Sequence, residues 1–415
     1  MHFQIQSETD RLEAVIVHTP GREVSLVNPE IREELLFDDI VYEEDARAEH
    51  VDMLSIFRAA LPENGRVFEI LDLASEALQQ EGAKEWFVEG LISIVPEENL
   101  HLIRNKLIQI HKTELLQFVV EGLSPHDIPF NLPPSPNLLF TRDLGAVIGN
   151  RIILTRMAQS ARKREALIME LIVTFHPFFE TLQGHVIQIP EGHSIEGGDI
   201  LMALPDTVLI GMSERTTFGG LMSVANQLLY GKIKHVVAVD IPKKRSSMHL
   251  DTIFTFADKT ECVVFNPVIN SSSSQVVLLT RSGGEESAEK IQLDVMPGLK
   301  KALEEISGES FTFIPCGGKE LTNQFREQWT DGANLFALAP GVVVGYERNT
   351  HTFSEMAEHG YRLMNQFEFI EEFTQKKFDP TQEGKLAISF QGHELCRGRG
   401  GARCMTLPLR RSAHA

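Results

Sequence analysis

The chain has 415 residues, of which 42% are hydrophobic and 23% charged, a composition typical of a folded protein with a large apolar core. Its formal net charge of -19 argues against nucleic acid as a partner, because phosphate binding requires a basic surface. No apolar run approaches the ~20 residues of a membrane span, residues 1–8 lack a signal-peptide pattern, and the four cysteines lack metal-type spacing. We therefore expect a cytoplasmic protein with reduced thiols, no metal and no membrane partner.

The segment from about residue 74 to residue 122 is predicted to be helical. It has no strand pattern, and apolar residues recur at helical spacing between Leu100 and Ile110. The prolines of Leu132–Pro136 then break regular structure. We expect an α-helical subdomain, residues 74–122, inserted into an α/β domain made of residues 1–73 and 123–415.

From residue 138 onward one pattern recurs, in which a tight turn joins two short strands and a helix and a further strand follow. The expected strand pairs are 146–148 with 152–154, 200–203 with 208–210, 253–256 with 262–265, and 335–338 with 342–344. Helices are expected at 162–182, 217–230, 299–306 and 354–365, and closing strands at 185–189, 235–239 and 311–314. The third helix follows a polar segment that includes Ser271–Ser274 and Gly283–Gly284.

A fifth unit is split between the two ends of the chain. Cys404–Pro408 would supply one strand and Leu12–Val17 its neighbour. A closed ring that uses both ends would account for this split, and recurrence of one unit favours a repeat architecture. A plain α+β domain with several hairpins remains the alternative at this point.

Titratable side chains stand where the first strand of three units begins, and a cysteine holds the matching place in the split unit. These residues are Asp143, Glu196 with Asp199, His249 with Asp251, and Cys404. A lone aspartate before a strand is usually a turn residue, so Asp143 or Asp199 alone would be assigned a structural role. His249 and Asp251, two residues apart in an extended segment, project to the same face. Pseudo-symmetry would bring all of these strand ends into one pocket.

The residues before Cys404 suit a reactive thiol. Three arginines and three glycines crowd Arg397–Arg403, and positive charge favours the nucleophilic thiolate. Carboxylates near an ordinary ester or amide would repel the developing oxyanion, whereas they can hold a planar guanidinium through paired hydrogen bonds. The residues therefore predict a cationic substrate held by Asp143 and Asp251 and attacked by Cys404.

Five segments together resemble the arginine deiminase family, and the match covers nearly the whole chain. They are Phe140–Asp143, Glu196–Asp199, Ser213–Thr216, Met248–Thr252 and Arg397–Met405. The resemblance implies an α/β fold, a five-bladed pseudo-symmetric propeller of ββαβ units with an inserted helical bundle. It also implies hydrolysis of L-arginine to L-citrulline and ammonia without metal or cofactor, and a homo-oligomeric state.

The resemblance further implies a role for each site residue. Cys404 would attack the guanidinium carbon to give a covalent thiouronium, while His249, oriented by Glu196, would protonate the departing ammonia and then deprotonate water. Substrate contacts are implied for Asp143 and Asp251 at the guanidinium, for Asn137, Arg162 and Arg215 at the α-carboxylate, for Phe140 and Gly398 at the α-amino end, and for Arg399 near the entrance.

Three alternatives stay open. Leu144 and Cys396 replace a proline and a serine that are frequent in the family, so a related guanidine (agmatine, methylated arginine or an amidino donor) remains possible as substrate. Arg162 and Arg215 would separate agmatine from arginine, because agmatine has no carboxylate. A catalytically idle arginine-binding protein is the third reading.

Because the carboxylates raise the pKa of the Cys404 thiol, we predict that the bound cation assists thiolate formation.

Overall fold

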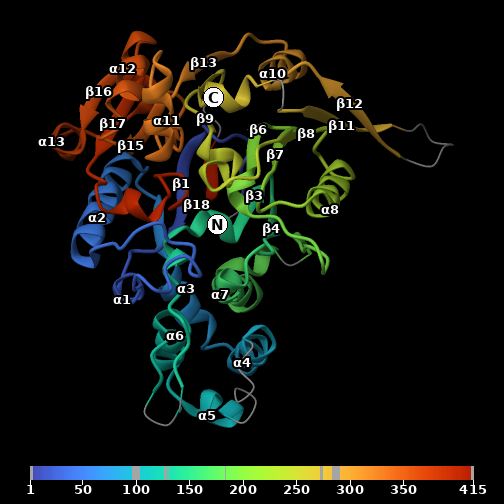
Figure 1. Ribbon diagram of the computed structural model, residues 1–415, viewed down its shortest axis with the longest axis vertical. Helices are drawn as coiled ribbons and strands as arrows, with labels where there is room; N and C mark the ends of the chain where they lie inside the picture. The colour runs from blue at the N-terminus through green and yellow to red at the C-terminus, as the bar shows by residue number, and fades with distance from the viewer. Residues whose placement is uncertain are drawn as a thin grey trace.

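The computed structural model describes residues 3–95, 103–125, 128, 130–182, 184–271, 274–282 and 290–412. Leu100, the pair Gly283–Gly284 and residues 272–273 of the polar segment lie outside these ranges. The described residues form a mixed α/β fold in which five sheets of three to five strands are interleaved with helices (Figure 1). No described helix has the length and apolar character needed to cross a membrane.

One sheet joins the two ends of the chain, as expected. Strand β1 (Arg11–Val17) pairs antiparallel with β18 (Leu407–Ser412) and parallel with β2 (Arg66–Glu69), so blue and red strands lie side by side in Figure 1. Strand β18 begins later than predicted, and Cys404 lies in the turn before it. Cys404 therefore lies just before a strand of this sheet rather than within it.

The described part of residues 74–122 is helical. Its helices are α3 (Ile70–Ala77), α4 (Ala83–Ile94), α5 (Arg104–Gln109) and α6 (Lys112–Glu121), and they extend away from the sheets in Figure 1. Helix α6 starts with a capping box between His111 and Glu114 and ends at Gly122 with φ +76°. A Cβ at Gly122 would lie 2.0 Å from the Leu132 carbonyl oxygen, so the chain turns closely back on itself there.

All four expected hairpins form antiparallel pairs. They are β3 (Gly145–Ile148) with β4 (Arg151–Leu154), β6 (Ile200–Leu204) with β7 (Thr207–Met212), β9 (Phe254–Phe256) with β10 (Glu261–Val264), and β14 (Phe336–Ala339) with β15 (Val342–Tyr346). The closing strands β5 (Val186–Ile187), β8 (His235–Asp240) and β13 (Thr312–Pro315) each run parallel to the second strand of their hairpin. Helices α7 (Lys163–Phe175), α8 (Phe218–Leu229) and α10 (Leu299–Ser307) lie between.

Two expectations of the sequence differ from the structure. The helix predicted over 354–365 is helix α12 (Thr350–Glu358) followed by strand β16 (Arg362–Asn365), which pairs with β17 (Leu386–Phe390). The segment before α10 contains a hairpin, β11 (Val276–Ser282) with β12 (Lys290–Met296), that extends the β6–β8 sheet to five strands. The serines and glycines of this segment had led us to expect a polar segment without strands there.

Candidate active site

Short 3-10 helices stand directly before the first strand of three hairpins and carry the predicted residues. They are η3 (Thr141–Leu144), η6 (Gly197–Asp199) and η8 (Leu250–Thr252). Gly198 allows these turns to meet, because a Cβ there would lie 2.7 Å from the His249 ring and 2.9 Å from Oδ1 of Asp143. Gly198 therefore makes room for the imidazole, and Gly197 for the Arg142 carbonyl.

Asp199 links the strand ends without facing the pocket. Its Oδ2 accepts hydrogen bonds from Ser213 and Thr216, both 2.6 Å, and its Oδ1 accepts one from the Leu250 amide at 2.8 Å. Burial raises the pKa of Asp199 to about 7, although the charge of His249 and these hydroxyls oppose the shift. The sequence left Asp199 with either a structural role or a place in the pocket, and these contacts give it the structural role.

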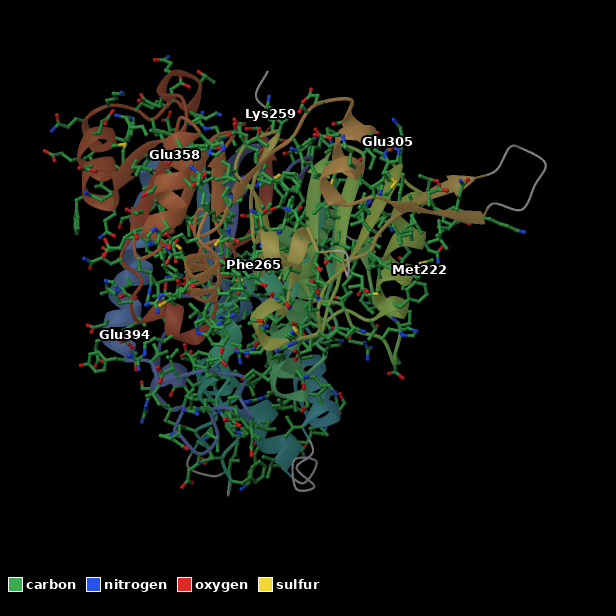
Figure 2. The ribbon with its side chains drawn as sticks, turned by 45° about the horizontal axis from the view of Figure 1, so that its top comes forward. Met222, Lys259, Phe265, Glu305, Glu358 and Glu394 are labelled. Carbon is green, nitrogen blue, oxygen red and sulfur yellow. The ribbon has the colours of Figure 1, made fainter. Side chains whose placement is uncertain are left out.

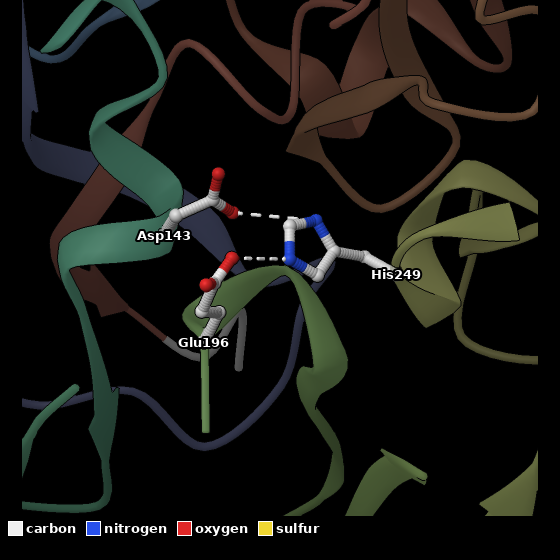
Figure 3. Close-up of side chains that lie close together, drawn as sticks. All are labelled: Asp143, Glu196 and His249. Carbon is white, nitrogen blue, oxygen red and sulfur yellow. Dashed lines mark hydrogen bonds and ion pairs between the residues drawn. The ribbon is translucent and has the colours of Figure 1, made fainter. Parts of the chain in front are cut away.

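His249 lies between two carboxylates (Figure 3). Its Nε2 donates to Oε2 of Glu196 at 2.8 Å, and its Nδ1 is 3.6 Å from Oδ1 of Asp143. Burial disfavours the imidazolium, but the charge of Asp143 and the bond to Glu196 raise the pKa of His249 to about 9. Glu196 is fully buried, and its bond to His249 together with the charges of Arg215 and Arg162 keeps its pKa low. At neutral pH His249 is therefore a cation that can give up a proton.

The same three residues are the one group of metal-type ligands in the described ranges. Their negative charge is already balanced by guanidinium groups: Nη1 of Arg162 is 2.5 Å from Asp143 and 3.8 Å from Glu196, and Nη1 of Arg215 is 3.8 Å from Glu196. A divalent ion here would sit against two buried cations. The donor set therefore fits proton transfer better than metal binding.

Cys404 is held at the pocket by its backbone and by Asp251. Its amide donates to Oδ1 of Asn334 at 3.0 Å, and its Sγ donates to Oδ2 of Asp251 at 3.7 Å. Asn334 in turn donates to the Asp251 carbonyl at 3.0 Å. Burial raises the pKa of the Cys404 thiol well above its usual value, and the charges of Asp251 and Asp143 raise it further against the opposing effect of Arg403. The empty pocket thus holds a thiol.

Each of the two aspartates already contacts an arginine of the chain. Arg162 binds Asp143, and Nη1 of Arg403 donates to Oδ2 of Asp251 at 2.7 Å. The second oxygen of each aspartate, Oδ1, is buried and has no hydrogen-bond partner. Because a buried carboxylate oxygen without a partner is costly, these two atoms are acceptors ready for a donor-rich ligand.

The pocket between these groups is nearly filled by its own side chains. It has a volume of about 10 Å³, the room of a single water molecule, and its lining consists of Leu36, Asn137, Phe140, Asp143, Arg162, Arg215, Arg245, Met248, His249, Thr252, Arg399 and Cys404. Leu36 and Arg399, at its rim, are non-glycine residues with φ of +63° and +67°. Strained backbone at a rim marks a segment that is held in place by its contacts.

Arg399 is held at this rim by Trp329, which does not itself line the pocket. Its guanidinium stacks 3.8 Å above the Trp329 ring, and its Nη1 donates to the Trp329 carbonyl at 2.5 Å. Arg245 fixes the facing segment, because it donates to the Leu36 carbonyl at 2.6 Å and to Asp38. An arginine-sized ligand requires these rim contacts to open.

Most predicted site residues lie at this pocket, and three act from behind its wall. Glu196 reaches it through His249, Asp251 through Cys404, and Gly398 packs behind Phe140. Asn137 donates to the Leu35 carbonyl at 2.6 Å, and its own carbonyl accepts from Arg162 at 3.0 Å. The residues that the sequence predicted for the site thus come together in space.

Sequence reasoning missed several contributors. Leu36 and Arg245 line the pocket outside the five motif segments, and Met248 and Thr252, at the two ends of one segment, line it without having been assigned a role. Asn334 was recognisable, since it begins the fourth unit at the place held elsewhere by titratable residues. Arg403 was given no partner from the sequence, and it joins Glu8 to Asp251, a contact between distant parts of the chain that no local pattern reveals.

Comparison with known proteins agrees with this geometry. The family model for arginine deiminase matches residues 95–411. The arginine deiminase of Listeria monocytogenes (strain HCC23) is 35% identical over 99% of this chain and 98% of its own length, and that of Bacillus cereus (strain ATCC 10987) is 33% identical over 98% of each.

Solved structures of related folds are more distant in sequence. An amidinotransferase from Microseira wollei superposes with a TM-score of 0.56 at 13% identity, covering 99% of this chain and 98% of the other. The N-terminal domain of a cyanobacterial arginine dihydrolase gives a TM-score of 0.54 at 13% identity, covering 97% and 98%. These likenesses concern the fold alone, whereas the family model and the full-length relatives decide membership: the chain belongs to the arginine deiminase family.

Proposed function

We propose that this protein hydrolyses L-arginine to L-citrulline and ammonia at the pocket beside Cys404. The observation that carries the proposal is the set of groups that meet there, namely a buried thiol, an imidazolium between two carboxylates, and two unpartnered carboxylate oxygens. A guanidinium supplies several N–H donors in one plane, which is what two facing carboxylates can accept.

In the proposed complex the substrate guanidinium enters between Asp143, which lines the pocket, and Asp251, which lies behind Cys404, and it binds their Oδ1 atoms. Arg162, Arg215 and Asn137 receive the α-carboxylate. Phe140, Gly398 and Arg399 surround the α-amino end. Arg162 is supported for this role by its burial and its second bond, 2.8 Å to Glu165, which keeps it anchored when the Asp143 contact is shared with substrate.

The reaction then proceeds in two halves. The substrate cation lowers the pKa of the Cys404 thiol, which releases its proton to solvent, and the thiolate adds to the guanidinium carbon. His249 donates its proton to one nitrogen, the C–N bond breaks, ammonia leaves, and a thiouronium remains on the sulfur. Neutral His249 next takes a proton from water as hydroxide adds to the same carbon, and the C–S bond breaks while the remaining hydroxyl proton passes to the sulfur, which gives citrulline and the Cys404 thiol. Glu196 stabilises the cationic form of His249 throughout.

A direct assay tests the reaction. The protein is incubated separately with L-arginine and with agmatine, and citrulline, carbamoylputrescine and ammonia are measured. We expect citrulline and ammonia in equal amounts from arginine only, and none from Cys404→Ala. Carbamoylputrescine as the main product would favour agmatine, and no product from either substrate would contradict the proposal.

A labelling experiment tests how the thiolate forms. We expect 2-chloroacetamidine, a cation, to alkylate Cys404 much faster at neutral pH than the neutral 2-chloroacetamide, because only the cation lowers the thiol pKa. Asp143→Asn should reduce that preference. Equal alkylation rates for the two reagents would show that the thiolate forms without help from a cation.

We also propose how the sheets, the helical subdomain and the subunits are arranged. The five sheets would be the blades of a pseudo-symmetric propeller, a reading supported by their recurring hairpin–helix–strand order. Helices α3–α6 would form the subdomain inserted between residues 1–73 and 123–415. The protein would work in the cytoplasm as a homo-oligomer, without a cofactor.

A further inference from the structure

Strand β12 is the outer edge of the five-stranded sheet β12-β11-β8-β7-β6 and, among the described residues, the longest edge strand. It pairs with β11 over seven residue pairs without a bulge. Strand β11 reaches β8 only through Val276–Leu279, so the outer part of the hairpin projects past the body of the protein (Figures 1 and 2). The backbone of β12 is therefore open to a further strand on its outer side.

The side chains of β12 divide into two rows. Ile291, Leu293 and Val295 form an apolar row, in which Leu293 is 53% and Val295 78% exposed. The other row consists of Lys290, Gln292, Asp294 and Met296, and within it Gln292 donates to Asp294 at 2.9 Å. Exposed edges readily pair with another strand unless a bulge, a proline, a short length or charged side chains prevent it, and of these β12 has only two charged side chains, Lys290 and Asp294.

We propose that β12 pairs antiparallel with β12 of a second copy of this chain, about a two-fold axis at Leu293. Leu293 then faces the partner's Leu293, and Ile291 faces the partner's Val295. On the other face, Gln292 donates to the partner's Asp294. The strand is thus complementary to itself from Ile291 to Val295, as a two-fold interface requires, and two five-stranded sheets become one.

A neighbouring register is less favourable. An axis at Gln292 would put Lys290 opposite the partner's Asp294, but would leave Val295 outside the pairing of described residues. Covering an exposed apolar side chain stabilises an interface more than a solvent-exposed ion pair does. The axis at Leu293 covers both exposed apolar residues and still leaves Lys290 diagonal to the partner's Asp294.

Cysteine cross-linking tests the axis. Two residues on the axis of an antiparallel pair have Cα atoms about 4.5–5.5 Å apart, within the range of a disulfide. We expect Leu293→Cys to give disulfide-linked dimers under mild oxidation. Lys290→Cys, on the same strand, is the matched control and should not cross-link, because its two copies lie at opposite ends of the paired strands. The four native cysteines are buried. Faster cross-linking of Lys290→Cys or Gln292→Cys than of Leu293→Cys would overturn the proposed register.

Sedimentation of the full chain tests the interface itself. The wild type should sediment as a dimer or an even multiple of it, and Leu293→Glu, which puts two like charges on the axis, should halve the mass without lowering Tm. Leu363→Glu, at an exposed leucine on the edge strand β16, should leave the mass unchanged. A monomeric wild type, or a Leu293→Glu protein of undiminished mass, would overturn the proposal. Neither readout depends on catalysis.

Discussion

At the scale of single residues, the site is governed by how burial and charge shift pKa values in opposite directions. Burial and the charges of Asp251 and Asp143 raise the pKa of the Cys404 thiol, and the charge of Asp143 also raises the pKa of His249. A thiolate–imidazolium pair is therefore not preformed in the empty pocket, and the substrate cation supplies the missing stabilisation of the thiolate. The guanidinium groups of Arg162 and Arg403, which occupy one oxygen of each aspartate, prevent two bare carboxylates from facing each other.

The pH dependence of catalysis should report on Glu196. His249 must be protonated to release ammonia, so kcat/KM should fall as pH rises through about 9, the pKa of His249. In Glu196→Gln one negative charge is lost, the pKa of His249 falls, and the alkaline limb should move to lower pH while kcat drops about 100-fold or more. Glu191→Gln, an exposed control, should keep the wild-type profile. If the alkaline limb of Glu196→Gln stayed at the wild-type pH, that limb would not report the protonation of His249.

His50 should make the protein sensitive to acid. It is completely buried in helix α2 (Glu43–Ala60) and neither ring nitrogen has a hydrogen-bond partner. Burial and the charge of His18 lower its pKa to about 3, against about 6.5 in the unfolded chain. The unfolded state therefore binds more protons below pH 6.5, and stability is lost progressively as pH falls toward 3.

We expect His50→Leu to remove this loss. Relative to its own stability at pH 7.5, the variant should be about 2 kcal/mol better preserved at pH 5 than the wild type, as measured by denaturant unfolding. His351→Leu, an exposed histidine, should leave the difference between the two pH values unchanged. Equal acid sensitivity in His50→Leu and wild type would mean that His50 is protonated in the folded state.

At the scale of elements, the glycines of η6 set the distance between strand ends. Gly198→Ala would push a methyl group into the His249 ring, because no space exists at 2.7 Å. We expect a fall in kcat of at least about 10-fold, since a small misplacement of a proton donor is costly, with little change in Tm. A variant with normal kcat would show that the ring has room to shift, and a collapsed Tm would show that the clash is with the fold instead.

The elements also show which parts of the fold and the site could be predicted from the sequence, and why. The four hairpins were predictable because short apolar runs flank turn residues such as Gly149–Asn150, a local signal. Strand β16 was taken for the end of a helix because nothing between α12 and it breaks the apolar pattern except Gly360. The site residues could be named because they follow motifs, whereas the Arg403–Asp251 pair and the Leu36 rim depend on contacts between distant segments.

At the scale of the whole molecule, the two ends of the chain are bound together next to the nucleophile. Strand β18 pairs with β1, Glu8 binds Arg403, and Arg403 binds Asp251. Cys404 lies immediately before β18, so its position depends on a strand that contains none of the proposed catalytic groups. Loss of the final strand should therefore remove both the fold and the chemistry.

Deletion of residues 407–415 tests this dependence. The truncated chain keeps every proposed catalytic residue but loses Leu407 and Leu409, both completely buried. Burial of two leucines contributes about 3–6 kcal/mol, a large share of the about 5–15 kcal/mol of a typical protein, and the β1 ladder is lost as well. We expect little soluble protein and no citrulline formation. Arg410→Ala, which removes only a half-exposed ion pair with Glu13, should fold and react normally. A soluble truncated chain with a cooperative unfolding transition and activity would mean that the turn before β18 holds Cys404 in place without the strand.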